Sequence, residues 1–259
     1  MKVIILAGGQ GTRISEESFV KPKPLIEIGS KPIIWHIMKF YSSFGIKDFI
    51  ICCGYKGYLL KEYFVNYYLH NADIDIDLKN NKTKIQKNKN EHWRVKLIDT
   101  GENTMTGGRI LRIKKFIKKN EDFCLTYGDG LSDINIKKLI SFHKKNKNLA
   151  TITAAKPTGR YGSIEIDKKN IVTNFIEKPE GDKNWINGGF FVLNQGIFKY
   201  LNNDDDIWEQ GPLQRLSEEK KLMAYKHHGF WKAMDTLSDK HYLENIWNTK
   251  KVPWKIWND

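Results

Sequence analysis

The chain has 259 residues, 40% of them hydrophobic, and we expect neither a signal peptide nor a membrane span, because no apolar run exceeds the length of a buried strand or short helix. The formal net charge of +13 would suit a nucleic-acid binder, but the lysines are spread along the sequence rather than gathered in one stripe with interleaved aromatic residues. We therefore expect a soluble enzyme that binds an anionic small molecule, with neither a nucleic acid nor a membrane as its partner.

The first half of the chain alternates predicted strands and helices. Residues 3–7 are apolar throughout, which predicts a strand buried on both faces, and a glycine-rich loop follows at once. Pro32 opens a helical pattern over residues 33–44, and Gly45 stands at the C′ position that ends it. The other elements predicted here are a strand at 46–53, an aromatic-rich helix at 58–70, a half-exposed strand at 73–78, a polar hairpin or loop at 79–89, a strand at 93–98 and a helix from the Gly107-Gly108 pair to residue 117.

The second half continues the same alternation. Its predicted elements are strands at 122–127, 149–155 and 189–193, a helix at 136–146, a hairpin of 163–167 with 171–176, and two helices that flank a strand at 222–225. Alternating βα units imply a single α/β domain over residues 1–259, with a Rossmann-like, mostly parallel, doubly wound sheet and added β-hairpin elements. Ligands bind beyond the carboxyl ends of such strands, where Gly8-Gly9 and Gly128-Asp129 fall.

The three cysteines carry no metal-binding pattern. Cys52 and Cys53 are adjacent in an apolar strand and Cys124 lies in another, so no C-x-x-C or Cys/His cluster is present. We expect reduced core thiols in a cytoplasmic protein.

The loop after the first strand has the composition of a nucleoside triphosphate site. Gly8, Gly9 and Gly11 have no Cβ, so the backbone can lie against a ligand, and Arg13 and Lys23 add positive charge beside it. The sequence matches neither the Walker pattern nor G-x-G-x-x-G, which excludes two other kinds of phosphate loop.

Two aspartates are candidate ligands of Mg²⁺, which takes one or two carboxylates together with phosphate oxygens. Asp129 stands between two glycines directly after a buried strand, and Asp235 follows an aromatic run. Each has a structural alternative: Asp129 would serve a β-turn, and Asp235 would be the N-cap of the following helix.

The combination of L-A-G-G-x-G-T-R with a later P-K-P resembles the sugar-phosphate nucleotidyltransferases, and the resemblance extends over nearly the whole chain. Within that family the sequence is most similar to the glucose-1-phosphate cytidylyltransferase branch. The segments that carry this similarity are 11–17, 35–39, 48–58, 99–101, 104–109, 126–130, 177–179, 186–191 and 234–236.

The resemblance implies transfer of CMP from CTP to glucose 1-phosphate, Mg²⁺ as cofactor, a homo-oligomer with a hexamer as one candidate, and CDP-glucose as a product used for O-antigen lipopolysaccharide. It implies that the backbone at Leu6, Ala7, Gly8, Gly9, Gln10, Gly11, Thr12 and Arg13 holds the nucleotide, that Thr104, Arg109 and Gly128 line its pocket, that Lys23 contacts the α-phosphate, and that Arg13 stabilises the leaving pyrophosphate. It further implies that Asp129 and Asp235 bind Mg²⁺, that Lys178 anchors the sugar phosphate, and that Gly162, Glu177, Asn187 and Gly188 surround the sugar.

The sequence departs from the family pattern at Lys232-Ala233 and at Ser238, near the metal or sugar end of the expected site. The base preference rests on the resemblance alone. Another base or sugar 1-phosphate, or a non-catalytic nucleotide-binding module, therefore stays an alternative.

Overall fold

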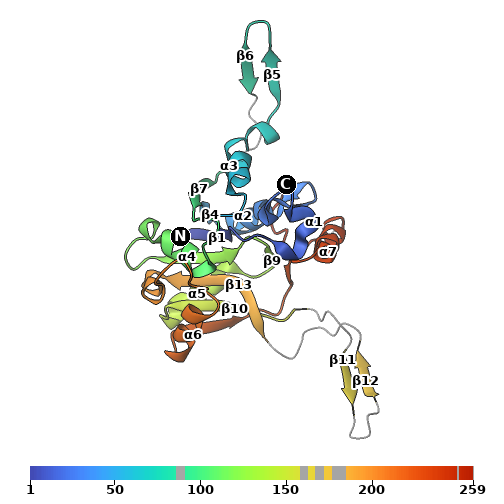
Figure 1. The fold of residues 1–259 in the computed structure, drawn as a ribbon. Coiled ribbons are helices and arrows are strands. Elements are labelled where there is room, and N and C mark those ends of the chain that lie inside the picture. The colour runs from blue at the N-terminus through green and yellow to red at the C-terminus, as the bar shows by residue number, and fades with distance from the viewer. Residues whose placement is uncertain (86–90, 158–162, 167–171, 177–184, 250, 259) are drawn as a thin grey trace.

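A seven-stranded sheet forms the centre of the protein (Figure 1). The structure is a computed structural model that describes residues 1–85, 91–157, 163–166, 172–176, 185–249 and 251–258. In sheet order the strands are β14 (Leu222–Lys226), β10 (Ala150–Ala155), β13 (Ile186–Asn194), β8 (Asp122–Tyr127), β1 (Lys2–Ala7), β4 (Asp48–Cys53) and β7 (Arg94–Asp99). All neighbours pair in parallel except β13, which is antiparallel to β10 and to β8. The predicted mostly parallel sheet is confirmed.

The first strand shows why this sheet lies inside the molecule. Successive side chains of a strand point to opposite faces. Val3 and Ile5 therefore enter one hydrophobic core, while Ile4 and Leu6 enter a second core on the other face. Since both sets are apolar, both faces of β1 need to be covered.

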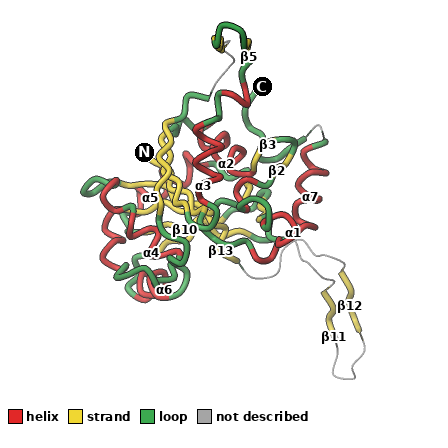
Figure 2. Tube along the Cα trace, turned by 45° about the horizontal axis from the view of Figure 1, so that its top comes forward, coloured by secondary structure: helices red, strands yellow, loops and turns green. Residues whose placement is uncertain are grey.

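Helices cover the two faces as a doubly wound fold requires. Helices α2 (Ile33–Ser43), α3 (Gly57–Val65), α5 (Ile136–Asn146) and α7 (Leu237–Trp247) contribute to the first core. Helices α4 (Thr106–Arg112) and α6 (Gly211–Glu218) contribute to the second. Shorter helical pieces are η1 (Thr12–Ile14), α1 (Ser15–Ser18), η2 (Lys23–Leu25), η3 (Leu69–Asn71), η4 (Lys114–Phe116) and η5 (Gln195–Tyr200). Figure 2 shows the helices on both sides of the strands.

The helix boundaries follow the sequence signals closely at α2 and α5. Gly45 adopts a φ of 86° directly after the turn that ends α2, as expected of a C′ glycine. The helix predicted at 58–70 is shorter: α3 ends at Val65, and the turn of η3 takes up part of the remainder.

In the part of the chain that the structure describes, four two-stranded sheets complete the fold. They pair β2 (Glu27–Ile28) with β3 (Lys31–Pro32), β5 (Ile74–Asp77) with β6 (Lys82–Ile85), β9 (Gly130–Ser132) with β15 (Trp231–Ala233), and β11 (Ser163–Ile166) with β12 (Val172–Ile176). The predicted hairpin of β11 with β12 is confirmed.

The hairpin of β5 and β6 corrects one expectation. It projects from the body in Figure 1, and all four residues of β5 are exposed, so this strand is not half-buried. Alternating Asp and Ile residues predicted one face against a core, but the projecting hairpin has no core to meet within the chain. The polar segment after it supplies β6, the second strand of the hairpin.

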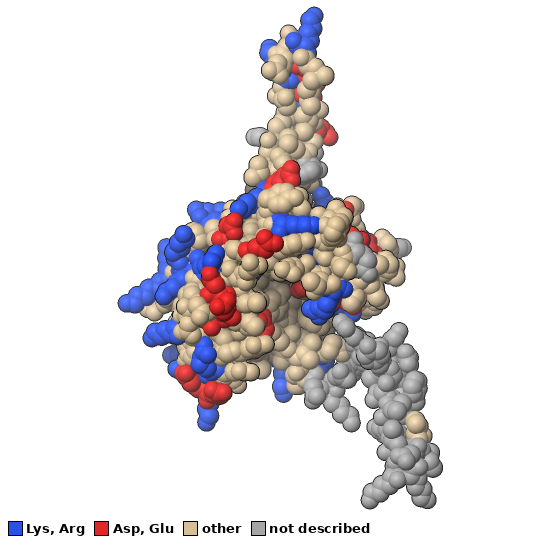
Figure 3. All heavy atoms as spheres, in the orientation of Figure 1, with Lys and Arg blue, Asp and Glu red and all other residues tan. Residues whose placement is uncertain are grey.

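The positive charge is distributed over the surface. In the face shown in Figure 3, Lys and Arg side chains occupy several separate places with Asp and Glu between them. None of the helices in the described ranges has the length and apolar character needed to cross a membrane.

Candidate functional site

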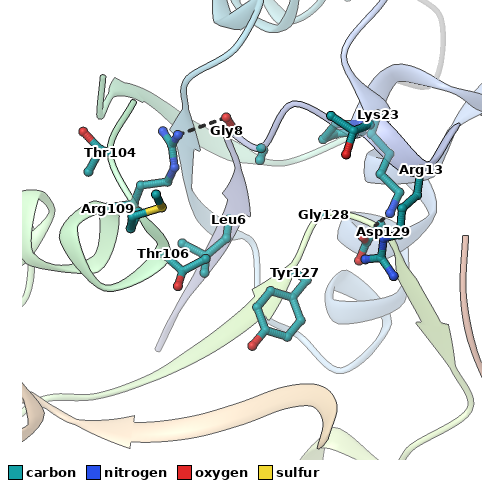
Figure 4. Close-up of a pocket in the computed structure, with 16 residues that line it drawn as sticks. Leu6, Gly8, Arg13, Lys23, Thr104, Thr106, Arg109, Tyr127, Gly128 and Asp129 are labelled. Atoms are coloured by element: carbon teal, nitrogen blue, oxygen red, sulfur yellow. Dashed lines mark hydrogen bonds and ion pairs between the residues drawn. The ribbon is translucent and has the colours of Figure 1, made fainter. Parts of the chain in front are cut away.

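A cleft of about 370 Å³ opens at the carboxyl ends of β1 and β8 (Figure 4). This is the edge of the sheet at which the sequence predicted a ligand site. Its lining residues are Leu6, Ala7, Gly8, Gly9, Gly11, Thr12, Arg13, Lys23, Pro24, Thr104, Met105, Thr106, Arg109, Tyr127, Gly128 and Asp129. Of the residues expected around the nucleotide, only Gln10 is absent from this lining.

The three loop glycines differ in what a side chain at each position would meet. A Cβ on Gly8 would lie 2.2 Å from a guanidinium nitrogen of Arg109, which is too close for any side chain. Gly11 has a φ of 66°, the left-handed region that glycine adopts without strain. A Cβ on Gly9 would meet nothing within 4 Å. Gly9 therefore keeps open space in the cleft, and the other two shape the loop.

The guanidinium of Arg109 binds the glycine loop and the segments that follow β4 and β7. It donates to the carbonyl oxygens of Gly8 at 3.0 Å, Cys53 at 3.3 Å, Gly101 at 2.6 Å and Glu102 at 3.0 Å, and to Oγ1 of Thr100 at 2.8 Å. The residue is only 4% exposed. Because both of its Nη groups bond to the protein, Arg109 is placed to hold the ends of β1, β4 and β7 together at the wall of the cleft.

Lys23 joins the two predicted metal ligands at the other side of the cleft. Its Nζ lies 2.6 Å from Oδ2 of Asp129 and 2.8 Å from Oδ1 of Asp235. Burial disfavours the charged ammonium, but the charges and hydrogen bonds of the two carboxylates outweigh it, so the pKa of Lys23 is raised. The lysine thus stays protonated between two carboxylates that come from distant parts of the chain.

The short sheet of β9 and β15 brings the two aspartates together. Gly130 pairs with Ala233 in that sheet, and the N–H of Met234 donates to the carbonyl of Asp129 at 2.9 Å. Asp129 therefore precedes one strand at the point where Asp235 follows the other. This pairing of three-residue strands places side by side two residues that the sequence separates widely.

Asp235 does not cap the helix that follows it, and Asp129 directs its side chain to Lys23. The N-cap of α7 is Thr236, which forms a capping box with Asp239, so the N-cap role proposed for Asp235 is wrong. Asp129 does lie in a turn, but its side chain turns to Lys23 rather than to the turn backbone.

Arg13 stands at the mouth of the cleft. Its guanidinium donates to Oδ2 of Asp235 at 2.9 Å, and its side chain is 69% exposed. Lys23 and Arg13 therefore bind the same carboxylate through its two different oxygens.

The donor set suits a hard divalent cation. Within the described ranges, no group of three or more His, Cys, Asp or Glu side chains could enclose a metal. Asp129 and Asp235 nevertheless converge on one positive charge, the ammonium of Lys23. Mg²⁺ takes few protein ligands and completes its coordination shell with water and phosphate oxygens. Two carboxylates are therefore a sufficient protein contribution to a Mg²⁺ site.

The far side of the cleft contains residues that sequence reasoning did not single out. Tyr127 and Thr106 both line the cleft, and each donates a hydrogen bond to the carboxylate of Glu209, at 2.5 and 2.6 Å. Tyr127 carried a sequence signal, since it directly precedes Gly128-Asp129, whereas Glu209 lies in an irregular segment without any motif.

Two predicted sugar-binding residues lie next to this group. Asn187 donates from Nδ2 to the hydroxyl of Tyr127 at 3.2 Å. The carbonyl of Gly188 accepts from the indole nitrogen of Trp231 at 2.6 Å. The other residues expected at the sugar, Gly162, Glu177 and Lys178, lie outside the described residues.

The nucleotidyl transferase family model matches residues 2–236, which include the whole cleft. The chain belongs to the nucleotidyl transferase family. It is 54% identical over 257 residues to a glucose-1-phosphate cytidylyltransferase of Salmonella typhimurium, covering 99% of this chain and 100% of that protein. It is 40% identical over 258 residues to a probable glucose-1-phosphate cytidylyltransferase of Bacillus subtilis, again covering 99% and 100%.

Solved structures bear out the fold of this nucleotidyl transferase. HddC from Yersinia pseudotuberculosis superposes with a TM-score of 0.67 over 95% of this chain and 99% of its own, at 23% identity. The predicted family membership and fold class are both confirmed.

One of the departures from the family pattern has a structural role. Lys232 forms an ion pair of 2.5 Å with Asp239, the buried capping residue of α7. Burial raises the pKa of Asp239, but the bonds from Lys232 and Thr236 outweigh it, so the net pKa is lowered. Lys232 thus stabilises the start of the helix that directly follows Asp235. Ser238 is exposed on that helix.

Proposed function

We propose that this nucleotidyl transferase moves CMP from CTP to glucose 1-phosphate and releases pyrophosphate. The observation that carries the proposal is the ammonium of Lys23 held between Asp129 and Asp235 beside the glycine loop. The cytidylyltransferase names of relatives that match the chain end to end support the choice of substrates.

We further infer a magnesium ion held by Asp129 and Asp235, whose carboxylates already share one cation. When bound, the ion would supply positive charge that neutralises phosphate. Lys23, which pairs with both carboxylates in this structure, would then be free to contact the α-phosphoryl group.

The reaction requires little acid–base catalysis from the protein. The second pKa of a phosphate monoester is about 6, so the sugar phosphate is already ionised near neutral pH. Its oxygen attacks the α-phosphorus as the bond to pyrophosphate breaks, and no general base is required. The protein has to bring two polyanions together and align them, which makes positioning and charge neutralisation the main contributions.

Each charged residue of the cleft has a separate task in this proposal. Lys23, which is 9% exposed, faces charge that develops on the α-phosphoryl group. Arg13 is exposed at the mouth and suits the departing pyrophosphate. Arg109 keeps the glycine loop in place, so that Leu6 to Thr12 can present backbone N–H groups to the nucleotide.

The sugar would lie on the side of Tyr127, near Asn187 and Gly188. The hydrogen bond of Asn187 to Tyr127, which lines the cleft, supports this proposal. We keep Lys178 as the anchor of the sugar phosphate, with Gly162 and Glu177 near the sugar, as proposals from the family resemblance.

We also propose a cytoplasmic homo-oligomer, with a hexamer as one candidate. All three cysteines are free and buried, which suits a reducing compartment. The projecting hairpin of β5 and β6 exposes Ile74, Ile76 and Ile85, and apolar side chains displayed in this way suit contact with another copy.

A substrate panel tests the proposed reaction. The protein is incubated with Mg²⁺, glucose 1-phosphate and each of CTP, UTP, dTTP, GTP or ATP, and pyrophosphate release is followed with identification of the nucleotide sugar. CDP-glucose is expected as the dominant product. Comparable or faster turnover with another base would refute the base assignment, and no release with any triphosphate and a panel of sugar phosphates would refute the enzymatic proposal.

A further inference from the structure

The carboxylate of Glu209 connects two walls of the cleft. Its Oε2 accepts from Thr106, the first residue of α4, at 2.6 Å. Its Oε1 accepts from the hydroxyl of Tyr127, the last residue of β8, at 2.5 Å. In Figure 4 the hydroxyl groups of Thr106 and Tyr127 both point away from Lys23, toward the same side of the cleft. Glu209 itself does not line the cleft, so any effect on a ligand passes through its partners.

The direction of each hydrogen bond in this group follows from the carboxylate. An ionised carboxylate can only accept hydrogen bonds, so the hydroxyl of Tyr127 donates its single proton to Glu209. The hydroxyl oxygen of Tyr127 then faces Asn187 as an acceptor, and Asn187 donates to it from Nδ2 at 3.2 Å. At its other end, Oδ1 of Asn187 accepts the N–H of Gly189 at 2.8 Å. The amide of Asn187 is thus fixed in one of its two orientations.

Packing fixes the tyrosine ring as well. Gly189 has a φ of 75°, and a Cβ there would lie 2.6 Å from the ring of Tyr127. The ring also makes an edge contact with Phe191, with centroids 6.0 Å apart. Since the ring cannot swing freely, the hydroxyl keeps its place between Glu209 and Asn187. The charge of Glu209 and its bond disfavour ionisation further: burial raises the pKa of Tyr127 and the carboxylate adds to that rise.

The same segment supports the nucleotide side of the cleft. The carbonyl of Asp206 accepts from the N–H groups of Gly107 and Gly108, at 2.7 and 3.2 Å, at the start of α4. The N–H of Trp208 donates to Oγ1 of Thr106 at 2.9 Å. Thr106 is therefore held by several bonds, while Asn187 is oriented through Tyr127 and its neighbour Gly189. Loss of the carboxylate should affect the sugar side more than the nucleotide side.

We propose that Glu209 is a positioning residue for the sugar phosphate, because its carboxylate sets the hydrogen-bond direction through Tyr127 and so orients the amide of Asn187 toward the sugar. The inference rests on the proposed function. The oriented amide offers its second N–H as a fixed donor, which would recognise a hydroxyl group of the sugar in one position and not its epimer.

Replacement Glu209→Gln tests the direction of the bonds while nearly preserving the volume of the side chain. The glutamine amide can donate to Tyr127, which then points its proton toward Asn187 and favours the opposite orientation of that amide. Tyr127→Phe is the second variant, because it keeps the ring and removes only the hydroxyl. Glu218→Gln is the matched control, since Glu218 is exposed at the end of α6 and outside the group.

Steady-state kinetics with both substrates varied gives the decisive readout, with circular dichroism to confirm folding. We expect Glu209→Gln and Tyr127→Phe each to raise KM for glucose 1-phosphate about tenfold, the effect of one hydrogen bond. KM for CTP should change less than about threefold, and the double variant should be no worse than either single one. Preference for glucose 1-phosphate over its galactose and mannose epimers should weaken in both. Glu218→Gln should match the wild type.

The outcomes separate the two proposals. If the wild type is active and a folded variant keeps its KM for glucose 1-phosphate within about twofold of the wild-type value, the role of Glu209 alone is overturned. Equal increases of both KM values also overturn it, because they indicate a general structural role. If Glu209→Gln does not fold, Tyr127→Phe decides in the same way. A wild type and control that turn over no substrate overturn the proposed function, and the inference with it.

Discussion

Replacing Arg109 by lysine should weaken the fold and the nucleotide loop together. The guanidinium makes five hydrogen bonds, to the carbonyls of Gly8, Cys53, Gly101 and Glu102 and to the hydroxyl of Thr100. The carbonyls of Gly8 and Cys53 also accept from the N–H groups of Tyr55 and Thr100, so they keep a partner. Oγ1 of Thr100 and the carbonyls of Gly101 and Glu102 depend on the forked Nη groups, and the single nitrogen of an ammonium leaves at least one of them without its donor. An unsatisfied acceptor costs about 1–3 kcal/mol, so the variant should lose about 1–3 kcal/mol of stability. That is a substantial part of the 5–15 kcal/mol that typically stabilises a domain.

Arg112→Lys provides the matched control on the same helix. Arg112 pairs with Asp204 at the surface, where both side chains are more than 40% exposed, at 42% and 48%. Exposed pairs contribute about 0–1 kcal/mol, so this variant should lose less than about 1 kcal/mol.

Urea denaturation followed by tryptophan fluorescence compares the two variants, and kinetics with varied CTP reports on the loop. Arg109→Lys should unfold at clearly lower urea and show a raised KM for CTP, because the carbonyl of Gly8 loses one of its two donors and is held by the N–H of Tyr55 alone. If Arg109→Lys is as stable as Arg112→Lys, the predicted loss of hydrogen bonds is refuted. If it is destabilised without a change in KM for CTP, Arg109 supports the fold but does not shape the nucleotide loop.

Three other predictions concern the metal, the glycine loop and the buried His36. Asp129→Asn should fold normally but lose on the order of a hundredfold or more in kcat, since an amide is a poor ligand of Mg²⁺; near wild-type turnover at low Mg²⁺ would show that Asp129 is only a turn residue. Gly9→Ala should keep the stability of the wild type in thermal unfolding, because its Cβ meets no atom within 4 Å, yet raise KM for CTP by filling the cleft; an unchanged KM would place the nucleotide elsewhere. Burial lowers the pKa of His36 to about 4. Between pH 6.5 and pH 4 the histidine is protonated in the unfolded chain but neutral in the folded chain. The free energy of unfolding should therefore be highest above pH 6.5 and fall by about 3 kcal/mol as the pH approaches 4. Urea midpoints over that range should fall less steeply for His36→Gln, and an equal slope would exclude His36 as the cause.

The centre of the sheet could be predicted from the sequence because β1, β4 and β8 are built on continuous runs of buried residues. Such runs do not reveal direction, however, so the antiparallel insertion of β13 became visible only in the structure. The strand at Ile74–Asp77 shows another limit, since a pattern of alternating residues does not say whether the apolar face meets a core of the same chain.

The candidate site was predictable wherever a residue lies next to a buried strand. The glycine loop follows β1 and Asp129 follows β8, and both lie where the sequence placed them. The approach of Asp235 depends on the pairing of β9 with β15, strands too short to give a periodic signal. Glu209 had no signal, because its role arises from tertiary hydrogen bonds to two residues remote in sequence.

The central claim is that Lys23, Asp129 and Asp235 form the centre of phosphoryl transfer. The most direct test is an anomalous-difference map from crystals of the protein with CDP-glucose and Mn²⁺, an ion that replaces Mg²⁺ and can be located by its scattering. We expect one manganese peak between the carboxylates of Asp129 and Asp235, with the ammonium of Lys23 moved onto a phosphate oxygen. A peak remote from these aspartates, with Lys23 still bridging them while the nucleotide sugar is bound, would contradict it.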